Sequence, residues 1–233
     1  MRLTFLVLLA CLATAARAGE DQSSMRFDVR LLGLHAGVME IAARETDSAY
    51  AARSRFRTAG LVGVLKRVRA DVSVQGRVAQ GRLKPHDYSE AIDDGQRVTN
   101  VEVRFAPGEP HLLSGDTGSS APPADTSRLS DAIDPLTLLY LALRDQPRDK
   151  VCRFSADVFD GHRHAEIALN QRREQGEAIT CTGHYRRVSG YGNSERENRH
   201  VSITVQYEPN GSGMRAERVE FDTRLGPAVM DRR

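Results

Sequence analysis

The sequence predicts a mainly β protein, a curved antiparallel sheet or open β-barrel of about ten strands with one short buried helix. Three observations predict this class. Apolar and polar side chains alternate along most of the chain, which is the period of a strand with one buried face. Glycine, proline, asparagine and aspartate separate these stretches at short intervals. Beyond residues 1–18, one segment differs: after Asp134-Pro135 the chain is apolar at nearly every position.

The N-terminal half of the chain contains four clear alternating stretches. Their apolar positions fall within residues 25–31, 39–43, 50–56 and 68–74. Because short connections join them, we expect consecutive strands to pair as an antiparallel meander. A weaker strand after Lys84-Pro85 and a clear one at 101–105 follow. Residues 107–128 are rich in glycine, proline and small polar residues without periodicity, so we expect a mobile surface loop there.

One helix is predicted over residues 135–144. Asp134 can cap its first turn, and Pro135 suits the first helical position. The residues from Leu136 to Leu143 are apolar around nearly the whole circumference, which is typical of a helix buried on most sides. We therefore expect the helix to lie inside the concave side of the curved sheet.

Residues 1–18 have the features of a secretory signal peptide. A positive N-terminus precedes an apolar run at 3–15, and a small-x-small cleavage site ends at Ala18. Cleavage after Ala18 leaves 19–233 as a single β-rich domain, which we expect in the periplasm. An alternative takes Cys11 as the lipidated end of a lipoprotein, which would leave a very short leader. No other stretch approaches the roughly 20 apolar residues of a transmembrane helix, so no transmembrane segment is predicted.

Charge bears on the class of partner. The leader takes two of the 33 basic side chains with it, which leaves as many basic side chains as the 31 acidic ones. A chain without net charge has no long-range attraction for nucleic acid or anionic lipid, so no nucleic-acid partner is predicted. The cations at 53–57 and 66–69 could still meet lipid phosphate or cell-wall acid locally. A plain solvated outer face is the interpretation that we favour for them.

Two cysteines, Cys152 and Cys181, remain after cleavage. Each falls on the apolar side of an alternating stretch, so we expect two strands joined through the core by a disulfide in an oxidising compartment. The chain-entropy model assigns about 3–4 kcal/mol to the loop that such a bond closes. Two free buried thiols are the alternative, since cysteine alone is a good core residue. Alternation continues at 165–169 and 201–207, and a last strand covers 219–221.

Few residues suggest chemistry. His162, His164 and Glu166 share one face of a strand, and His184 has the outward parity of a neighbouring strand. Such a set can bind zinc or copper, but we favour a solvated polar face, and no metal or cofactor is predicted. The chain has no Gly-x-Ser-x-Gly elbow, no glycine-rich phosphate loop before a helix, and no thiolate once the cysteines pair. We therefore expect no catalytic residues and no enzymatic activity.

Several short motifs occur in an order that carries a resemblance. They are Gly33 and Gly37, Gly60-Leu61 with Gly63, Gly76 before Leu83-Lys84-Pro85, Ile133-Asp134-Pro135-Leu136, Val158-Phe159-Asp160-Gly161 with Arg163, and Cys152 and Cys181 followed by Tyr185 and Gly190-Tyr191. Together they resemble a bacterial exported family, the domain of unknown function numbered thirty-one hundred and eight, over nearly the whole mature chain. The resemblance implies a periplasmic curved antiparallel sheet, similar to the open half-barrels of lipoprotein carriers. It implies no catalytic residues.

The predicted function is a non-enzymatic binder or carrier of an apolar ligand or lipid in the cell envelope. The helix is too apolar for solvent, so Leu136, Leu139, Tyr140 and Leu143 are predicted to line or gate a ligand space. One alternative is a structural envelope-integrity factor that acts through a protein partner, with the helix as core alone. A hydrolase is the other alternative.

Overall fold

The computed structural model describes residues 21–105, 108–193, 195, 199–223 and 225–233, and of Leu61 it describes the backbone. The predicted leader at 1–18 therefore lies outside the described residues. The strands are β1 (Asp21–Leu31), β2 (Leu34–Glu45), β3 (Ala49–Thr58), β4 (Arg69–Ala79), β5 (Arg82–Asp93), β6 (Val98–Phe105), β7 (Pro110–Gly115), β8 (Phe154–Phe159), β9 (His164–Gln175), β10 (Ala178–Ser189), β11 (His200–Asn210), β12 (Gly213–Thr223) and β13 (Gly226–Arg232). Among the elements that the structure describes, the helices α1 (Gly60–Leu65) and α2 (Pro135–Leu143) interrupt the series.

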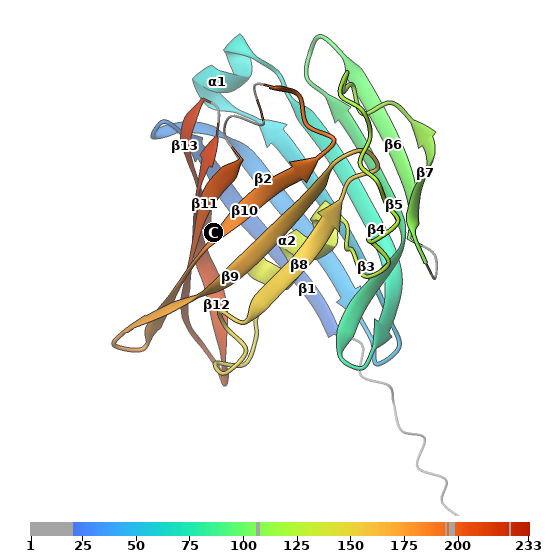
Figure 1. Cartoon of the computed structure of the whole chain (residues 1–233). Helices are drawn as coiled ribbons and strands as arrows, with labels where there is room; N and C mark the ends of the chain where they lie inside the picture. Colours follow the sequence, from blue (N-terminus) through green and yellow to red (C-terminus); the bar gives the residue numbers. More distant parts are fainter. Residues whose placement is uncertain (1–20, 106–107, 194, 196–198, 224) are drawn as a thin grey trace, which may run out of the picture.

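All thirteen strands belong to one antiparallel sheet that curls into a barrel shape (Figure 1). The strand order is β7-β6-β5-β4-β3-β2-β1-β13-β12-β11-β10-β9-β8. The first and last strands pair with each other, with Phe27 opposite Arg232. Each half of the chain is therefore a meander that runs outward from this central pair, and β7 and β8 are the two end strands. The predicted class is confirmed, with thirteen strands where about ten were expected.

Two local predictions need correction. The stretch at 107–128 is not irregular throughout, because Pro110–Gly115 forms β7 and pairs with β6. β7 is an edge strand, which pairs on one side only and therefore tolerates a proline that cannot donate a backbone hydrogen bond. For this reason its sequence does not show a clear strand pattern. Further along the same stretch, Ala124 is buried. The predicted break at 59–63 contains most of the short helix α1.

The core lies inside the curled sheet, around α2 (Figure 1). The largest fully buried side chains include Tyr88, Tyr207, Phe27, Ile41, Leu143 and Ile179. The buried residues of α2 are Leu136, Thr137, Tyr140 and Leu143. A helix that is apolar on all sides cannot be left in water, and the concave side of the sheet is where it can bury most of its surface. This confirms the predicted position of the helix.

The two ends of the sheet meet along a seam between β6–β7 and β8. The Phe159 ring of β8 packs edge-on against Phe105 of β6, with 6.5 Å between ring centroids. Gly161, just after β8, has a positive φ of 99°. A Cβ atom there would lie 2.9 Å from the side chains of both Val101 and Val103, so a larger residue would push the two ends apart.

The connection between β7 and α2 crosses this seam. Its residue Ile133 donates from its backbone N–H to the carbonyl of Asp157 and accepts from the N–H of Phe159, both at 2.9 Å. It therefore covers part of the free edge of β8, which would otherwise expose unpaired backbone groups. The same connection then turns inward and begins α2.

Candidate functional site: the seam groove

The N-terminus of α2 is held by a buried capping network. The carboxylate of Asp134 accepts hydrogen bonds from the backbone N–H groups of Leu136 and Thr137, each at 2.9 Å, and from the Thr137 hydroxyl at 2.5 Å. The Thr137 hydroxyl also lies 2.7 Å from the hydroxyl of Tyr50 on β3. Asp134 is fully buried, and this burial raises the pKa of its carboxyl to about 6 against the opposing effect of its hydrogen bonds. The network fixes where the helix begins.

The C-terminal end of α2 is tied to the opposite half of the sheet. Tyr207 of β11 donates from its hydroxyl to the carbonyl of Ala142 at 2.6 Å. Gln146, just past the helix, exchanges two backbone hydrogen bonds with Met214 of β12, at 3.0 and 2.8 Å. Arg144 forms an ion pair with Glu45 of β2 at 2.6 Å. Because both halves of the sheet grip the helix, α2 is a fixed wall for anything that lies beside it.

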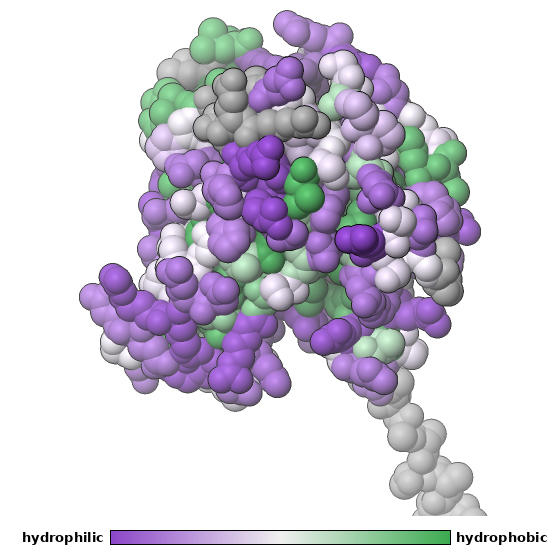
Figure 2. Space-filling model, viewed as in Figure 1, coloured by the Kyte–Doolittle hydropathy of each residue, from purple (hydrophilic) through white to green (hydrophobic). Residues whose placement is uncertain are grey.

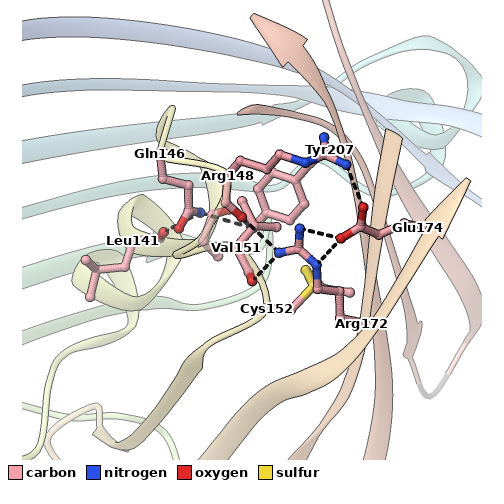
Figure 3. Close-up of a disulfide and its surroundings, with 10 residues drawn as sticks. Leu141, Gln146, Arg148, Val151, Cys152, Arg172, Glu174 and Tyr207 are labelled. Atoms are coloured by element: carbon pink, nitrogen blue, oxygen red, sulfur yellow. Dashed lines mark hydrogen bonds and ion pairs between the residues drawn. A yellow bond between two sulfur atoms is a disulfide. The ribbon is translucent and has the colours of Figure 1, made fainter. Parts of the chain in front are cut away.

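A disulfide between Cys152 and Cys181 holds the segment that follows α2 (Figure 3). Cys181 lies on β10 as predicted, but Cys152 lies in the turn before β8, with a positive φ of 63°. The predicted disulfide is present, whereas the prediction of a strand at Cys152 is wrong. Alternation across so few residues does not separate a strand start from an extended turn.

Arg172 of β9 reinforces the same segment (Figure 3). Its guanidinium donates to the backbone carbonyls of Arg148 and Val151, at 2.9 and 3.2 Å, and pairs with Glu174 at 2.7 Å. Arg148 pairs with the same carboxylate at 2.7 Å. Both the covalent bond and this charged network therefore fix the path of residues 148–152 along β9 and β10.

These elements leave a groove of about 990 Å³ where β8 faces the turn between β4 and β5. Figure 2 shows this hollow on the face viewed, with pale and green atoms inside it and purple margins. Its apolar lining includes Ile133, Leu141, Ala142, Phe154, Ala156, Ile167 and Leu169. We call this space the seam groove. Its volume lies in the range of small-molecule binding sites.

Among the described residues at the margins of the seam groove, the charged side chains that form no ion pair are basic. Its three carboxylates already have basic partners: Asp131 with Lys84, Asp157 with His164, and Glu166 with Arg186. Arg82 and Arg153 also line the groove, are exposed, and form no ion pair within the described part of the chain. The arrangement is an apolar floor with Arg82 and Arg153 at its rim, where Lys84 and, less strongly, Arg82 lower the pKa of the Asp131 carboxyl.

The four residues predicted to line a ligand space lie mainly on the other side of the helix. Leu136, Tyr140 and Leu143 are buried in the core, and Leu139 is partly buried against it. The helix residues that face the groove are Leu141 and Ala142. A role of the four residues in ligand binding stays a prediction. The sequence could not predict which face of the helix lies toward the groove, because a helix that is apolar all round has no polar face to distinguish it from.

The predicted polar face on β9 does bring donor atoms together. Asp157, His164 and Glu166 each offer one donor atom, and these atoms lie within 4.8 Å of one another. His164 Nε2 lies 2.7 Å from Asp157 Oδ1, and the Arg186 guanidinium donates a hydrogen bond to the carboxylate of Glu166. Imidazole and carboxylate groups suit zinc, so these three residues could hold such an ion if Arg186 moved away. His184 lies instead beside the ring of His200 on β11, at 5.9 Å between centroids.

A second polar cluster lies at the other end of the seam, beneath the turn between β8 and β9. Tyr88 donates to Glu90 at 2.7 Å, and the hydroxyls of Tyr185 and Tyr191 lie 2.9 Å apart. Burial raises the pKa of the Glu90 carboxyl, and the charge of Asp160 adds to this effect. None of these groups lines the seam groove. These groups lie on β5, on β10 and in the segments that follow β8 and β10. The cluster therefore connects strands from the two halves of the sheet.

Fold and site together define the class of protein: a barrel-shaped antiparallel sheet with an internal helix and a groove along its seam. The chain belongs to the family described as "Protein of unknown function (DUF3108)", whose model matches residues 26–232. No curated protein matches the chain. Within the described residues, no helix is long and apolar enough to cross a membrane.

One solved structure that is similar is a β-barrel-like protein of domain of unknown function DUF1849 from Brucella abortus. The two chains share 9% identity, with a TM-score of 0.48, and the match covers 93% of this chain and 96% of that one.

Proposed function

We propose that this protein is a non-enzymatic, periplasmic binder or carrier of a lipid-like amphiphile, which it holds in the seam groove. The acyl part lies on the apolar floor formed by α2, β8 and β9. An anionic head group lies at the rim, against Arg82 and Arg153. The observation that carries the proposal is the combination of this floor with two exposed arginines that form no ion pair in the described residues.

The lining of the site suits a ligand with an apolar part. The groove lies between β8 and the turn between β4 and β5 and is partly open to solvent, so a ligand can enter from outside. Its floor contains the partly buried side chains Leu141, Phe154 and Ala156, whose remaining exposed surface an acyl chain would remove from water. The ties at both ends of α2 and the disulfide keep that floor in place, which lowers the entropic cost of binding.

The head-group preference follows from charge. A guanidinium forms paired hydrogen bonds with carboxylate or phosphate oxygens, so Arg82 and Arg153 suit an acidic head group better than a neutral one. The expected export of the chain places the protein where such lipids occur. The predicted lack of catalysis is part of the same proposal, since binding alone is what the groove explains.

Native mass spectrometry of protein purified from its own periplasm tests the proposal directly. We expect an additional mass that denaturation releases and that corresponds to an acidic amphiphile. Protein that carries no such mass, and that also fails to bind a fluorescent fatty acid in titration, would refute the proposal.

A steric variant locates the ligand. Ala156→Trp fills the groove from β8 and should weaken fatty-acid binding at least about tenfold. Ala91→Trp, at an exposed position on β5 outside the groove, is the matched control and should bind as the wild type does. Arg153→Glu should weaken binding of the fatty acid but not of the corresponding fatty alcohol. Equal losses for both ligands would contradict the head-group assignment.

A further inference from the structure

One end of the barrel exposes a group of large apolar side chains. Among the described residues, Leu32 is 60% exposed, Leu34 57%, Val64 84%, Leu65 88% and Leu225 70%. They come from three separate connections: the β1–β2 turn, α1 and the β12–β13 turn. We call these five residues the apolar tip. Figure 2 shows green atoms at this end, over the position of α1 in Figure 1.

The three connections lie side by side. The N–H of Leu32 donates to the carbonyl of Pro227 at 3.0 Å, which joins the β1–β2 turn to the start of β13. The N–H of Ala59 donates to the carbonyl of Ala36 at 3.0 Å, which joins the start of α1 to β2. The three connections are therefore neighbours at one end of the barrel, and their exposed apolar side chains are grouped there. Single exposed apolar residues, in contrast, are common on any surface.

Basic residues follow directly behind the tip. Lys66, Arg67 and Arg69 are all exposed, and Lys66 pairs with Asp94 at 3.6 Å. Arg67 and Arg69 form no ion pair within the described part of the chain. Asp93 lies directly opposite Arg69 in the pairing of β4 with β5, and its carboxylate also accepts a hydrogen bond from the N–H of Gly95 at 2.9 Å. The tip is thus apolar at its extremity, and the three cations beside it outnumber the carboxylates of Asp93 and Asp94.

We propose that the apolar tip attaches the protein to the surface of a bilayer that contains anionic phospholipid. The tip side chains enter the boundary between head groups and acyl chains, while Arg67 and Arg69 lie at the level of the phosphates. Stable attachment to a membrane surface generally needs two signals, and an apolar insertion with neighbouring cations supplies both.

A membrane fits this end better than a protein partner does. The tip residues project from separate turns at the end of the barrel, and none of them lines the four hollows described for the structure. A bilayer accepts such a convex set of side chains without shape complementarity. The balanced charge of the mature chain gives no long-range attraction, so the local cations would act only after contact.

Vesicle flotation with residues 19–233 tests the proposal. We expect binding to vesicles of phosphatidylethanolamine and phosphatidylglycerol, and weaker binding to phosphatidylcholine alone. Leu65→Asp should lower the bound fraction at least about tenfold at limiting lipid, because it places a charge at the inserted end. Leu113→Asp on β7, also exposed, is the matched control and should leave binding unchanged. Arg67→Glu with Arg69→Glu should abolish the preference for the anionic vesicles.

Three results would overturn the proposal: no binding of the wild type to either vesicle, equal binding of wild type and Leu65→Asp, or loss of binding in Leu113→Asp. Light scattering distinguishes a second copy of the chain as the occupant. A wild-type dimer that Leu65→Asp converts to a monomer, without vesicle binding, would assign the tip to self-association. Ala156→Trp should still bind vesicles, so the proposal stands or falls separately from the seam groove.

Discussion

Replacing Asp134 by asparagine should change how the stability of the protein depends on pH. Asparagine keeps a side-chain oxygen that can accept from the N–H groups of Leu136 and Thr137, so the cap of α2 survives. It removes a carboxylate that is fully buried and whose pKa is raised from 3.8 to about 6. The amide nitrogen faces the Thr137 hydroxyl, which can accept a hydrogen bond while donating to Tyr50.

The sign follows from the direction of the shift. Because the folded-state pKa of Asp134 lies above the unfolded value, the folded wild type binds the proton more tightly than the unfolded chain does. The stabilising contribution of the protonated carboxyl is fully present below about pH 4 and is lost as pH rises through about 6. A shift of about two pKa units corresponds to roughly 3 kcal/mol of unfolding free energy.

Urea denaturation at constant ionic strength, followed by circular dichroism, measures this effect. Other carboxylates also titrate, so the useful quantity is the difference in unfolding free energy between Asp134→Asn and the wild type. We expect that difference to shift in favour of the variant by about 3 kcal/mol between pH 4 and pH 7. Asp149→Asn, at an exposed position, is the control and should show no such shift. A constant difference for Asp134→Asn, or one that moves against the variant as pH rises, would refute the reasoning.

Three further predictions concern stability. Replacing Cys152 and Cys181 together by serine should lower the unfolding free energy by roughly 3–4 kcal/mol, because the bond closes a loop with a sequence separation of 29; the difference from wild type should vanish under reducing conditions. Leu143→Ala should cost about 2–5 kcal/mol in urea denaturation, since Leu143 is fully buried, and Leu139→Ala should cost clearly less; equal costs would contradict the packing of α2. Gly183→Ala should destabilise strongly, because its Cβ would lie 1.8 Å from the Ala168 carbonyl oxygen. Gly192→Ala should melt near the wild-type temperature, because its Cβ would meet only Glu195 Oε2, at an ordinary contact distance of 3.8 Å.

The parts of the fold that could be predicted are those encoded by neighbouring residues. Alternation along single strands indicated the β class, and Asp134 followed by Pro135 indicated the start of α2. The disulfide followed from two cysteines in an expected oxidising compartment, although Cys152 lies in a turn. Each of these inferences needs a window of a few residues, which is the range over which periodicity and capping act.

The seam groove could not be predicted, because it depends on contacts between distant segments. Leu141 and Ala142 face it only because Leu136, Tyr140 and Leu143 are turned into the core, and an all-apolar helix does not encode that choice. The rim cations Arg82 and Arg153 lie far apart in the chain, one at the start of β5 and one directly after Cys152. The apolar tip was missed for the same reason, since its three connections are neighbours in space alone.

The position of the groove follows from the strand order. Because β1 pairs with β13, both ends of the described chain lie in the middle of the sheet, and the sheet ends with two strands from the middle of the sequence. The 38 residues between β7 and β8 must then cross the seam. They contain α2, so the same connection that crosses the seam also fills the barrel and forms one wall of the groove. Lengthening this connection just before Gln146 should therefore disturb the proposed ligand binding before it disturbs the sheet. The tie between Gln146 and Met214 depends on the path of this segment, whereas the pairing of β8 with β9 does not.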